Sequence, residues 1–159
     1  MGLTPPPTPG ARYRVVPAAY VYLLDAAGRV LLQRRAGTGF RDGHWAGLAG
    51  HVEDGESVLA AAVREAREEA GVDVATADLQ PLCAMHRTER TGLPVDERVD
   101  FFFCCRRWAG QVRRPHDAKA DAVAWFGLDA LPDPVVPHER LVLELIRRGE
   151  VPAVLTFGF

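Results

Sequence analysis

GHVEDGESVLAAAVREAREEAGV, the stretch from Gly50 to Val72, decides the fold of this chain. At about 100° per residue, a helix starting near Ser57 would place five apolar side chains on one stripe. The stripe consists of Leu59, Ala62, Val63, Ala66 and Ala70. Gly71 belongs to the residue type favoured just past a helix end and predicts the C-terminus there. We therefore predict a helix over residues 57–70 whose small side chains let it approach a sheet closely.

Three glutamates, Glu65, Glu68 and Glu69, fall within about 100° of arc on another side of this helix. Like charges at this spacing repel by a few tenths of a kcal/mol per pair, so something should compensate them. Carboxylate oxygens are the ligands that Mg²⁺ and Mn²⁺ prefer. Arg64 can pair with Glu68 or with Glu56 and so fix the carboxylates' orientation. The pattern indicates a metal site, and the alternative is a solvent-facing helix whose charges serve solubility.

The whole stretch fits the pattern G(x5)E(x7)REUxEExGU, where U is an aliphatic position, and so resembles the signature of the Nudix hydrolase family. The resemblance covers roughly residues 14–149. Residues 43–53 look like the family's approach loop, and residues 123–132 are similar to its last strand and the loop before the closing helix. The chain departs from the pattern at Ala66, usually a larger aliphatic residue, and at Leu48, where the loop often has proline.

The resemblance also implies roles for the charged residues of this stretch. The implied metal ligands are the side chains of Glu65, Glu68 and Glu69 and the backbone oxygen of Gly50. The family uses divalent ions, so we expect Mg²⁺ as the cofactor, with Mn²⁺ able to substitute. Arg64 completes the implied catalytic set, and its structural ion pair with Glu56 would brace the loop against the helix. We further hypothesise that Glu65 accepts the proton of the attacking water.

The reaction that the resemblance implies is attack of water on a nucleoside diphosphate linked to another group X. We expect a nucleoside triphosphate, normal or modified, as the small-molecule substrate, with a monophosphate and pyrophosphate as products. One alternative is a pyrophosphatase for ADP-ribose or a nucleotide sugar. Another is a nucleotide-binding regulator that has lost turnover, but every charged position of the signature is intact. The sequence does not determine the base, the sugar or the phosphorus that is attacked.

Arg35, His51 and Trp45 are the candidates for substrate binding. Arg34 and Arg35 end a predicted strand and alternate faces, so at most one of them points at the site. Arg35 is favoured because some family members carry a substrate-contacting arginine at the corresponding strand end. His51 adjoins Gly50 and so has a claim to lie near bound phosphate. Trp45 is able to stack on a base, with core packing as the alternative.

The remaining elements follow from apolar runs bounded by turn residues. Strands are expected at residues 14–24, 30–33, 79–87, 99–108 and 122–126, and a second helix at residues 138–148. The turn signal at residues 25–28 predicts that the first two strands pair as a hairpin, and residues 36–55 should form a glycine-rich loop. The order ββαβββα predicts an α+β fold, a Nudix-like α/β/α sandwich with a mixed central sheet.

Composition limits the classes of protein that remain. The chain has 159 residues, 48% of them hydrophobic and 25% charged, the balance of one globular domain. We expect a disordered Pro-rich tail at residues 1–11 and a single domain at residues 12–159. The net charge of −2 provides no general attraction to polymeric nucleic acid or to an acidic membrane. Three cysteines fit a reducing cytoplasm, no apolar run is long enough to span a membrane, and dimers are common in the family, which leaves a homodimer open.

Overall fold

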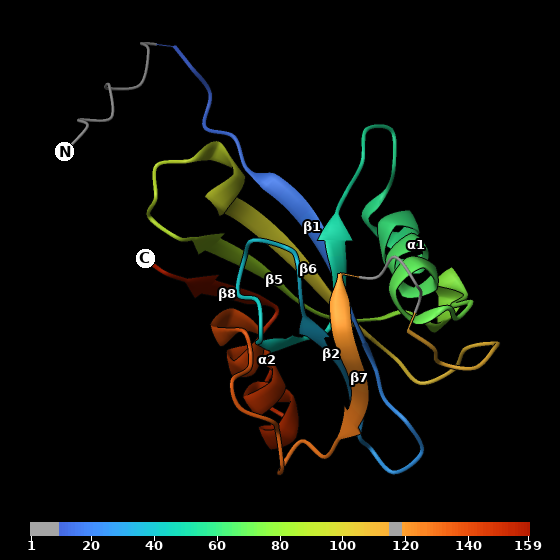
Figure 1. Ribbon diagram of the computed structural model, residues 1–159. Helices are drawn as coiled ribbons and strands as arrows, with labels where there is room; N and C mark the ends of the chain where they lie inside the picture. The colour runs from blue at the N-terminus through green and yellow to red at the C-terminus, as the bar shows by residue number, and fades with distance from the viewer. Residues whose placement is uncertain (1–9, 115–118) are drawn as a thin grey trace.

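The computed structural model describes residues 10–114 and 119–159. Within these residues, α1 (Val58–Ala70) and α2 (Pro137–Arg148) flank two sheets (Figure 1). The larger sheet has the strand order β4-β1-β6-β5-β8 and the smaller sheet has the order β3-β2-β7. The strands are β1 (Val16–Leu23), β2 (Val30–Arg35), β3 (Trp45–Ala46), β4 (Leu48–His51), β5 (Gln80–Thr88), β6 (Glu97–Cys105), β7 (Ala120–Phe126) and β8 (Val154–Phe157). Short 3₁₀ turns, η1 (Thr76–Asp78) and η2 (Pro94–Asp96), precede β5 and β6. Residues 1–9 of the predicted tail lie outside this range.

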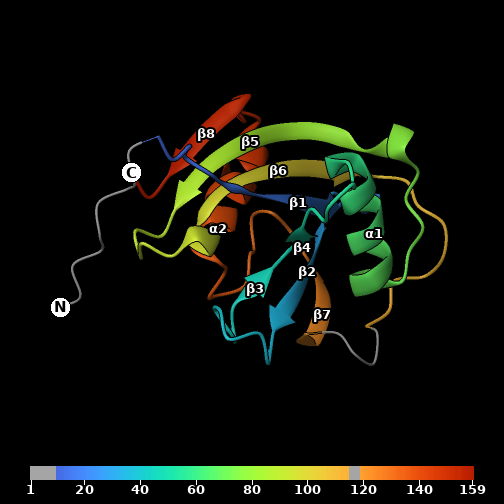
Figure 2. The ribbon, with the colours of Figure 1, turned by 90° about the horizontal axis from the view of Figure 1, so that it is seen from above.

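Side chains of both sheets contact both helices, which makes the molecule a sandwich. The larger sheet is mixed, because β1 pairs with β6 and β5 with β8 in parallel, whereas its other pairs are antiparallel. Val21 and Leu31 pack in the cluster that contains the alanines of α1, whereas Tyr20 and Leu32 pack in the cluster that contains Val142 of α2. In Figure 2 the two helices lie on opposite sides of the strands. The predicted α+β sandwich is confirmed.

Local signals set the limits of α1 as the sequence predicts. The hydroxyl of Ser57 accepts a hydrogen bond from the Ala60 backbone N–H at 3.1 Å, and Gly71 ends the helix with φ at 70°. The predicted apolar stripe is wrong in one member, since Leu59 is 36% exposed. Ala61 is buried in the α1 face together with Ala62, Ala66 and Ala70. The alanines let α1 lie close against β1 and β4, and this close approach also buries Glu65.

The hairpin predicted for the first two strands does not form. The turn is present, with the Asp25 carboxylate accepting hydrogen bonds from the backbone of Ala27 and Arg29. Beyond it, Leu24 and Val30 form an isolated bridge, and the two strands enter different sheets. Both strands are largely buried on both faces, and each pairs with other strands along both of its edges. β1 lies between β4 and β6, and β2 lies between β3 and β7.

The glycine-rich segment predicted as a loop contains two short strands. β3 belongs to the smaller sheet and β4 to the larger one, so the chain changes sheets at Gly47. A Cβ atom on Gly47 would lie 2.5 Å from Cε1 of Tyr22, so the backbone passes there only because the residue is glycine. The C-terminal strand β8 was also not predicted. No helix in the described part of the chain has the length and apolar character needed to cross a bilayer.

Candidate active site

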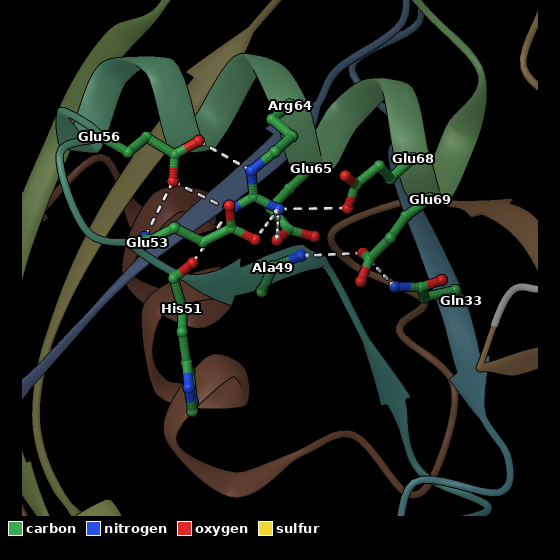
Figure 3. A network of polar contacts seen from close by, with 9 residues as sticks. All are labelled: Gln33, Ala49, His51, Glu53, Glu56, Arg64, Glu65, Glu68 and Glu69. Atoms are coloured by element: carbon green, nitrogen blue, oxygen red, sulfur yellow. Dashed lines mark hydrogen bonds and ion pairs between the residues drawn. The ribbon is translucent and has the colours of Figure 1, made fainter.

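Arg64 is the centre of a network of polar contacts between α1 and the loop that follows β4 (Figure 3). Its Nε and Nη2 atoms donate to the two carboxylate oxygens of Glu56 at 2.7 and 3.0 Å, and Nη2 also donates to the His51 carbonyl at 3.0 Å. The Glu53 backbone N–H donates to Glu56 at 3.0 Å. These bonds from Arg64 and Glu53 lower the pKa of Glu56. The expected pair between Arg64 and Glu56 is therefore present and braces the loop.

The same guanidinium orients two of the three glutamates. Nη1 of Arg64 donates to Glu65 at 2.6 Å and to Glu68 at 3.1 Å. Burial raises the pKa of Glu65, and this effect outweighs the attraction of Arg64, which lowers it. A Cβ atom on Gly50 would lie 1.9 Å from the Glu65 carboxylate. Glycine at this position therefore lets the carboxylate lie directly against the backbone of β4.

Glu69 lies in a different environment, one turn further along α1. Its Oε2 atom accepts hydrogen bonds from the Ala49 backbone N–H at 3.0 Å and from Nε2 of Gln33 at 2.5 Å. Burial and the charge of Glu65 raise the pKa of Glu69 to about 8, against the lowering effect of the two hydrogen bonds. Sequence reasoning missed Gln33, although a polar residue at the end of the apolar run Val30–Leu32 is the signal that could have found it.

A pocket of about 370 Å³ lies beside Gly50, and its lining includes Tyr20 of the cluster beside α2. Arg35, Phe40 and His51 line it. Nε of Arg35 donates to the Phe40 carbonyl at 2.8 Å, and the guanidinium carbon lies 5.5 Å from the Phe40 ring centre. Arg34 instead pairs with Asp121 of β7 at 2.7 Å, so the two arginines point in different directions, as strand alternation predicts. Burial and the charge of Arg98 lower the pKa of His51.

Trp45, the third candidate for substrate binding, does not line this pocket. Its ring packs edge-on against Phe126 with the ring centres 4.8 Å apart, and it borders the apolar cluster beside α2. Trp45 therefore packs at the border of the core in this structure, and its stacking on a base stays a prediction. Two arginines that sequence reasoning missed, Arg87 on β5 and Arg98 on β6, do line the pocket. Nothing in their local sequence marks them, because only the pairing of β5 with β6 brings them to the site.

The donor set beside Gly50 fits a hard divalent cation in its chemistry. It offers three carboxylates and a backbone carbonyl, and oxygen atoms are the ligands that Mg²⁺ prefers. Glu69 forms no ion pair with any residue in the described ranges, and the donors to its carboxylate, Gln33 and Ala49, are uncharged. As placed, no three His, Cys, Asp or Glu side chains among the described residues converge on one point to hold an ion. Cation binding would therefore draw the glutamates together from their contacts with Arg64 and Ala49.

Known proteins resemble this chain in sequence. The NUDIX domain family model matches residues 14–146. The chain is 32% identical over 145 residues to the 8-oxo-dGDP phosphatase NUDT18 of Homo sapiens, a match that covers 87% of this chain and 41% of that protein. It is 30% identical over 151 residues to the RNA pyrophosphohydrolase of Agrobacterium fabrum, covering 82% of this chain and 88% of that protein.

Solved structures show the same fold. A MutT NUDIX hydrolase from Burkholderia pseudomallei superposes with a TM-score of 0.73 at 24% identity, covering 82% of this chain and 97% of that one. The chain spans about two fifths of the length of the human relative and of the NAD-capped RNA hydrolase NudC of Pseudomonas aeruginosa. Because the family model matches most of the chain and the fold agrees with that of solved members, this chain belongs to the Nudix hydrolase family.

Proposed function

We propose that this protein is a divalent-metal-dependent hydrolase that splits a nucleoside triphosphate, normal or modified, into a monophosphate and pyrophosphate. The observation that carries the proposal is the arrangement of three glutamates of α1 around Arg64 and Gly50 at the edge of a ligand-sized pocket. The diphosphate would lie at the glutamates and the remainder of the substrate would enter the pocket. Its volume of about 370 Å³ lies in the range of small-molecule sites.

The residues that would hold the metal are Glu65, Glu68, Glu69 and Gly50, the last through its carbonyl oxygen. Mg²⁺ is the expected ion and Mn²⁺ the expected substitute, because both prefer oxygen ligands. When bound, such a cation neutralises the phosphate charge that opposes attack and makes water a better nucleophile. Arg64, held by Glu56, orients the Glu65 and Glu68 carboxylates for this task.

The other groups of the site bind and orient the substrate. Glu65 is the proposed acceptor of the water proton, because its carboxylate is buried beside Gly50 and is held by a single guanidinium. Arg35 and His51 lie at the pocket, where they can contact the part of the substrate that extends from the metal site. We also propose that the protein works in a reducing cytoplasm, since its cysteines Cys83, Cys104 and Cys105 are free and buried.

The test is a panel of nucleoside triphosphates, ADP-ribose, nucleotide sugars and dinucleotides, incubated with Mg²⁺ or Mn²⁺ and separated by chromatography. We expect release of pyrophosphate and a nucleoside monophosphate from triphosphates. The double variant Glu68→Gln/Glu69→Gln is the blank, and Glu144→Gln/Glu150→Gln is the matched control, because it removes two carboxylates at and just beyond α2, away from the site.

Each outcome of this panel decides between the candidate functions. Pyrophosphate release that disappears in the blank and persists in the matched control supports the proposal. Cleavage of ADP-ribose or nucleotide sugars without pyrophosphate release replaces it with the nucleotide-sugar alternative. Nucleotide binding with no metal-stimulated turnover of any substrate in the panel replaces it with a binding protein.

A further inference from the structure

The pocket beside Gly50 contains a cross-strand group of charged side chains that the proposed hydrolysis does not use. Arg87 of β5 and Arg98 of β6 are register partners, and Asp100 lies two residues further along β6 on the same face. Arg87 is 3% exposed and Asp100 is completely buried, so their charges lie where unpaired groups are costly. Of this group, Arg87 and Arg98 line the pocket together with His51 and Tyr20.

The two arginines differ in what holds them. Nε of Arg87 donates to Asp100 at 2.8 Å, and its Nη1 donates to Glu89 at 2.8 Å. Arg98 has looser contacts, because its Nη2 lies 3.6 Å from the same Asp100 and its buried Nε has no hydrogen-bond partner among the described residues. Arg87 is therefore held by the protein, whereas the guanidinium of Arg98 has donor capacity left for a ligand.

The charges around the pocket balance. Arg35, Arg87 and Arg98 contribute three positive charges. The acids that line the pocket or pair with these arginines contribute three negative charges, and they are Glu89, Asp96 and Asp100. A pocket with no excess of positive charge has little to attract a further phosphate. The free hydrogen-bond donors of Arg98 instead suit an uncharged group that carries hydrogen-bond acceptors.

The walls suit a flat group. Phe40 and Tyr20 line the pocket, and the Phe40 side chain is 36% exposed. The Phe40 ring is the face available to stack on a nucleobase, because the Tyr20 ring is already stacked on Phe102 with the ring centres 4.5 Å apart. Gly50 also lines the pocket, and the Glu65 carboxylate lies directly against Gly50, so an occupant of the pocket would lie near this glutamate of α1. The occupant of the pocket is thus the group that is attached to the sugar of the substrate.

We propose that this pocket holds the nucleobase and that Arg98 selects 6-oxopurines, the bases guanine and hypoxanthine, by donating to O6 and N7. The inference rests on the proposed function for the placement of the phosphates at the glutamates. Guanine and hypoxanthine present two adjacent acceptors, O6 and N7, to a planar guanidinium. Adenine replaces O6 with an amino group that donates, and 8-oxoguanine carries a hydrogen on N7, so each places a donor against the donors of Arg98.

The first measurement compares kcat/KM for GTP, ITP, ATP and 8-oxo-GTP in the presence of Mg²⁺. A bidentate contact of this type discriminates between bases by about 10- to 100-fold, so we expect GTP and ITP to exceed ATP and 8-oxo-GTP by that factor. In Arg98→Gln the ratio of GTP to ATP should fall to near one. Arg106→Gln is the matched control, because Arg106 is exposed just past the end of the same strand and should leave the ratio unchanged.

A second variant keeps the test decisive if Arg98→Gln fails to fold. Arg98→Lys keeps the positive charge beside Asp100 but loses the planar fork, so it too should lose most of the preference for GTP over ATP. Wild-type protein that hydrolyses all four triphosphates at similar kcat/KM overturns the inference. So does a preference for GTP that survives in whichever of the two Arg98 variants folds.

Binding without turnover separates this inference from the proposed function. Titration calorimetry with GMP, IMP and AMP in the absence of metal should show tighter binding of GMP and IMP, lost in the Arg98 variants. Arg98-dependent GMP binding by a protein that hydrolyses no triphosphate supports the pocket assignment and refutes the proposed function. Turnover at the same kcat/KM for every base supports the proposed function and refutes the pocket assignment. A protein that neither binds GMP nor hydrolyses any triphosphate refutes both proposals.

Discussion

The three glutamates of α1 are not equivalent. Glu65 and Glu68 accept hydrogen bonds from Arg64, whereas Glu69 accepts them from the uncharged donors Ala49 and Gln33. A buried carboxylate without a cationic partner favours its protonated form, and the pKa of Glu69 is raised to about 8 accordingly. Of the three glutamates, Glu69 therefore gains most from a bound cation.

Replacing Glu69 with glutamine tests its assignment as a metal ligand. Glu69→Gln keeps the shape and an oxygen that accepts from Ala49, but it removes the charge that a cation needs. We expect kcat/KM to fall by at least about 100-fold and the Mg²⁺ concentration for half-maximal activity to rise. Steady-state kinetics across a Mg²⁺ titration measures both. Glu144→Gln on α2 is the control, and unchanged turnover in Glu69→Gln would refute the role of Glu69.

The close approach at Gly50 predicts a second effect of a single residue. Gly50→Ala would place a Cβ atom 1.9 Å from the Glu65 carboxylate, so Glu65 or β4 must move. Overpacking of this kind costs roughly 1–3 kcal/mol of unfolding free energy, and we expect it to reduce turnover as well. Urea denaturation and kinetics measure the two effects. Gly127→Ala is the control, because its Cβ atom would meet chiefly the Asp129 side chain, which can swing aside.

At the scale of elements, α2 supports the site from the far side of the sheets. Glu139 of α2 is buried, and its Oε1 atom accepts hydrogen bonds from the Gly47 backbone N–H at 2.7 Å and from the Tyr22 hydroxyl at 3.0 Å. The Gly47 carbonyl accepts from Gln33 at 3.4 Å, and Gln33 also bonds Glu69. A continuous set of hydrogen bonds therefore links α2 to Glu69 through the point where the chain changes sheets.

This link predicts that Glu139 stabilises the fold through its oxygen rather than its charge. Glu139→Ala would leave the Gly47 N–H and the Tyr22 hydroxyl without partners and open a small cavity, at a cost of about 2–5 kcal/mol. Glu139→Gln keeps an acceptor and should cost much less. Urea denaturation of both variants measures the difference. Equal destabilisation by alanine and glutamine would contradict this explanation.

At the scale of the whole molecule, the two sheets and two helices bury acidic groups at the junction between layers. Burial raises the pKa of Glu139 to about 7 and that of Glu69 to about 8, from an ordinary value near 4.5. Burial lowers the pKa of His138 below its ordinary value of 6.5. Groups whose pKa is raised by folding and groups whose pKa is lowered by folding change the stability in opposite directions as pH changes. The slope of the unfolding free energy against pH therefore differs between the pH range below 6.5 and the range above it.

Between about pH 6.5 and pH 8 the two glutamates should dominate. Each binds its proton more tightly in the folded state, so its contribution is fully present below about pH 4.5 and is lost as pH rises through the folded pKa. The contribution of His138 is lost only as pH falls below 6.5. In EDTA, the free energy of unfolding should therefore decrease from pH 6.5 to pH 8. Urea denaturation at these pH values measures it.

Metal and the two glutamine variants are the controls for this pH dependence. A cation that binds ionised Glu69 stabilises the folded state more as pH rises, so Mg²⁺ should reduce the decrease. Glu69→Gln and Glu139→Gln should each remove part of it. A free energy of unfolding that stays constant from pH 6.5 to pH 8 in EDTA would refute the claim that burial in the folded state raises the pKa of Glu69 and of Glu139.

The sequence alone predicted both helices, the strands β1, β2, β5, β6 and β7, and the part of the site that lies within one segment, but not β3, β4 or β8. The bounds of α1, the pairing of Arg64 with Glu56 and the common side of the three glutamates all follow from spacings of a few residues along residues 50–72. The divergence of Arg34 and Arg35 follows from strand alternation in the same way. Such features are local, because helical and strand periodicity fix the relative directions of nearby side chains.

The tertiary structure decided which strands pair and which distant residues meet. The predicted hairpin was wrong because the apolar pattern shows that β1 and β2 are buried but not which strands lie beside them. Gln33 reaches Glu69 only because α1 packs across the junction of the sheets, and Arg87 meets Arg98 only through the register of β5 and β6. Contacts between residues far apart in the chain depend on how whole elements share buried surface, and no short segment of sequence contains that information.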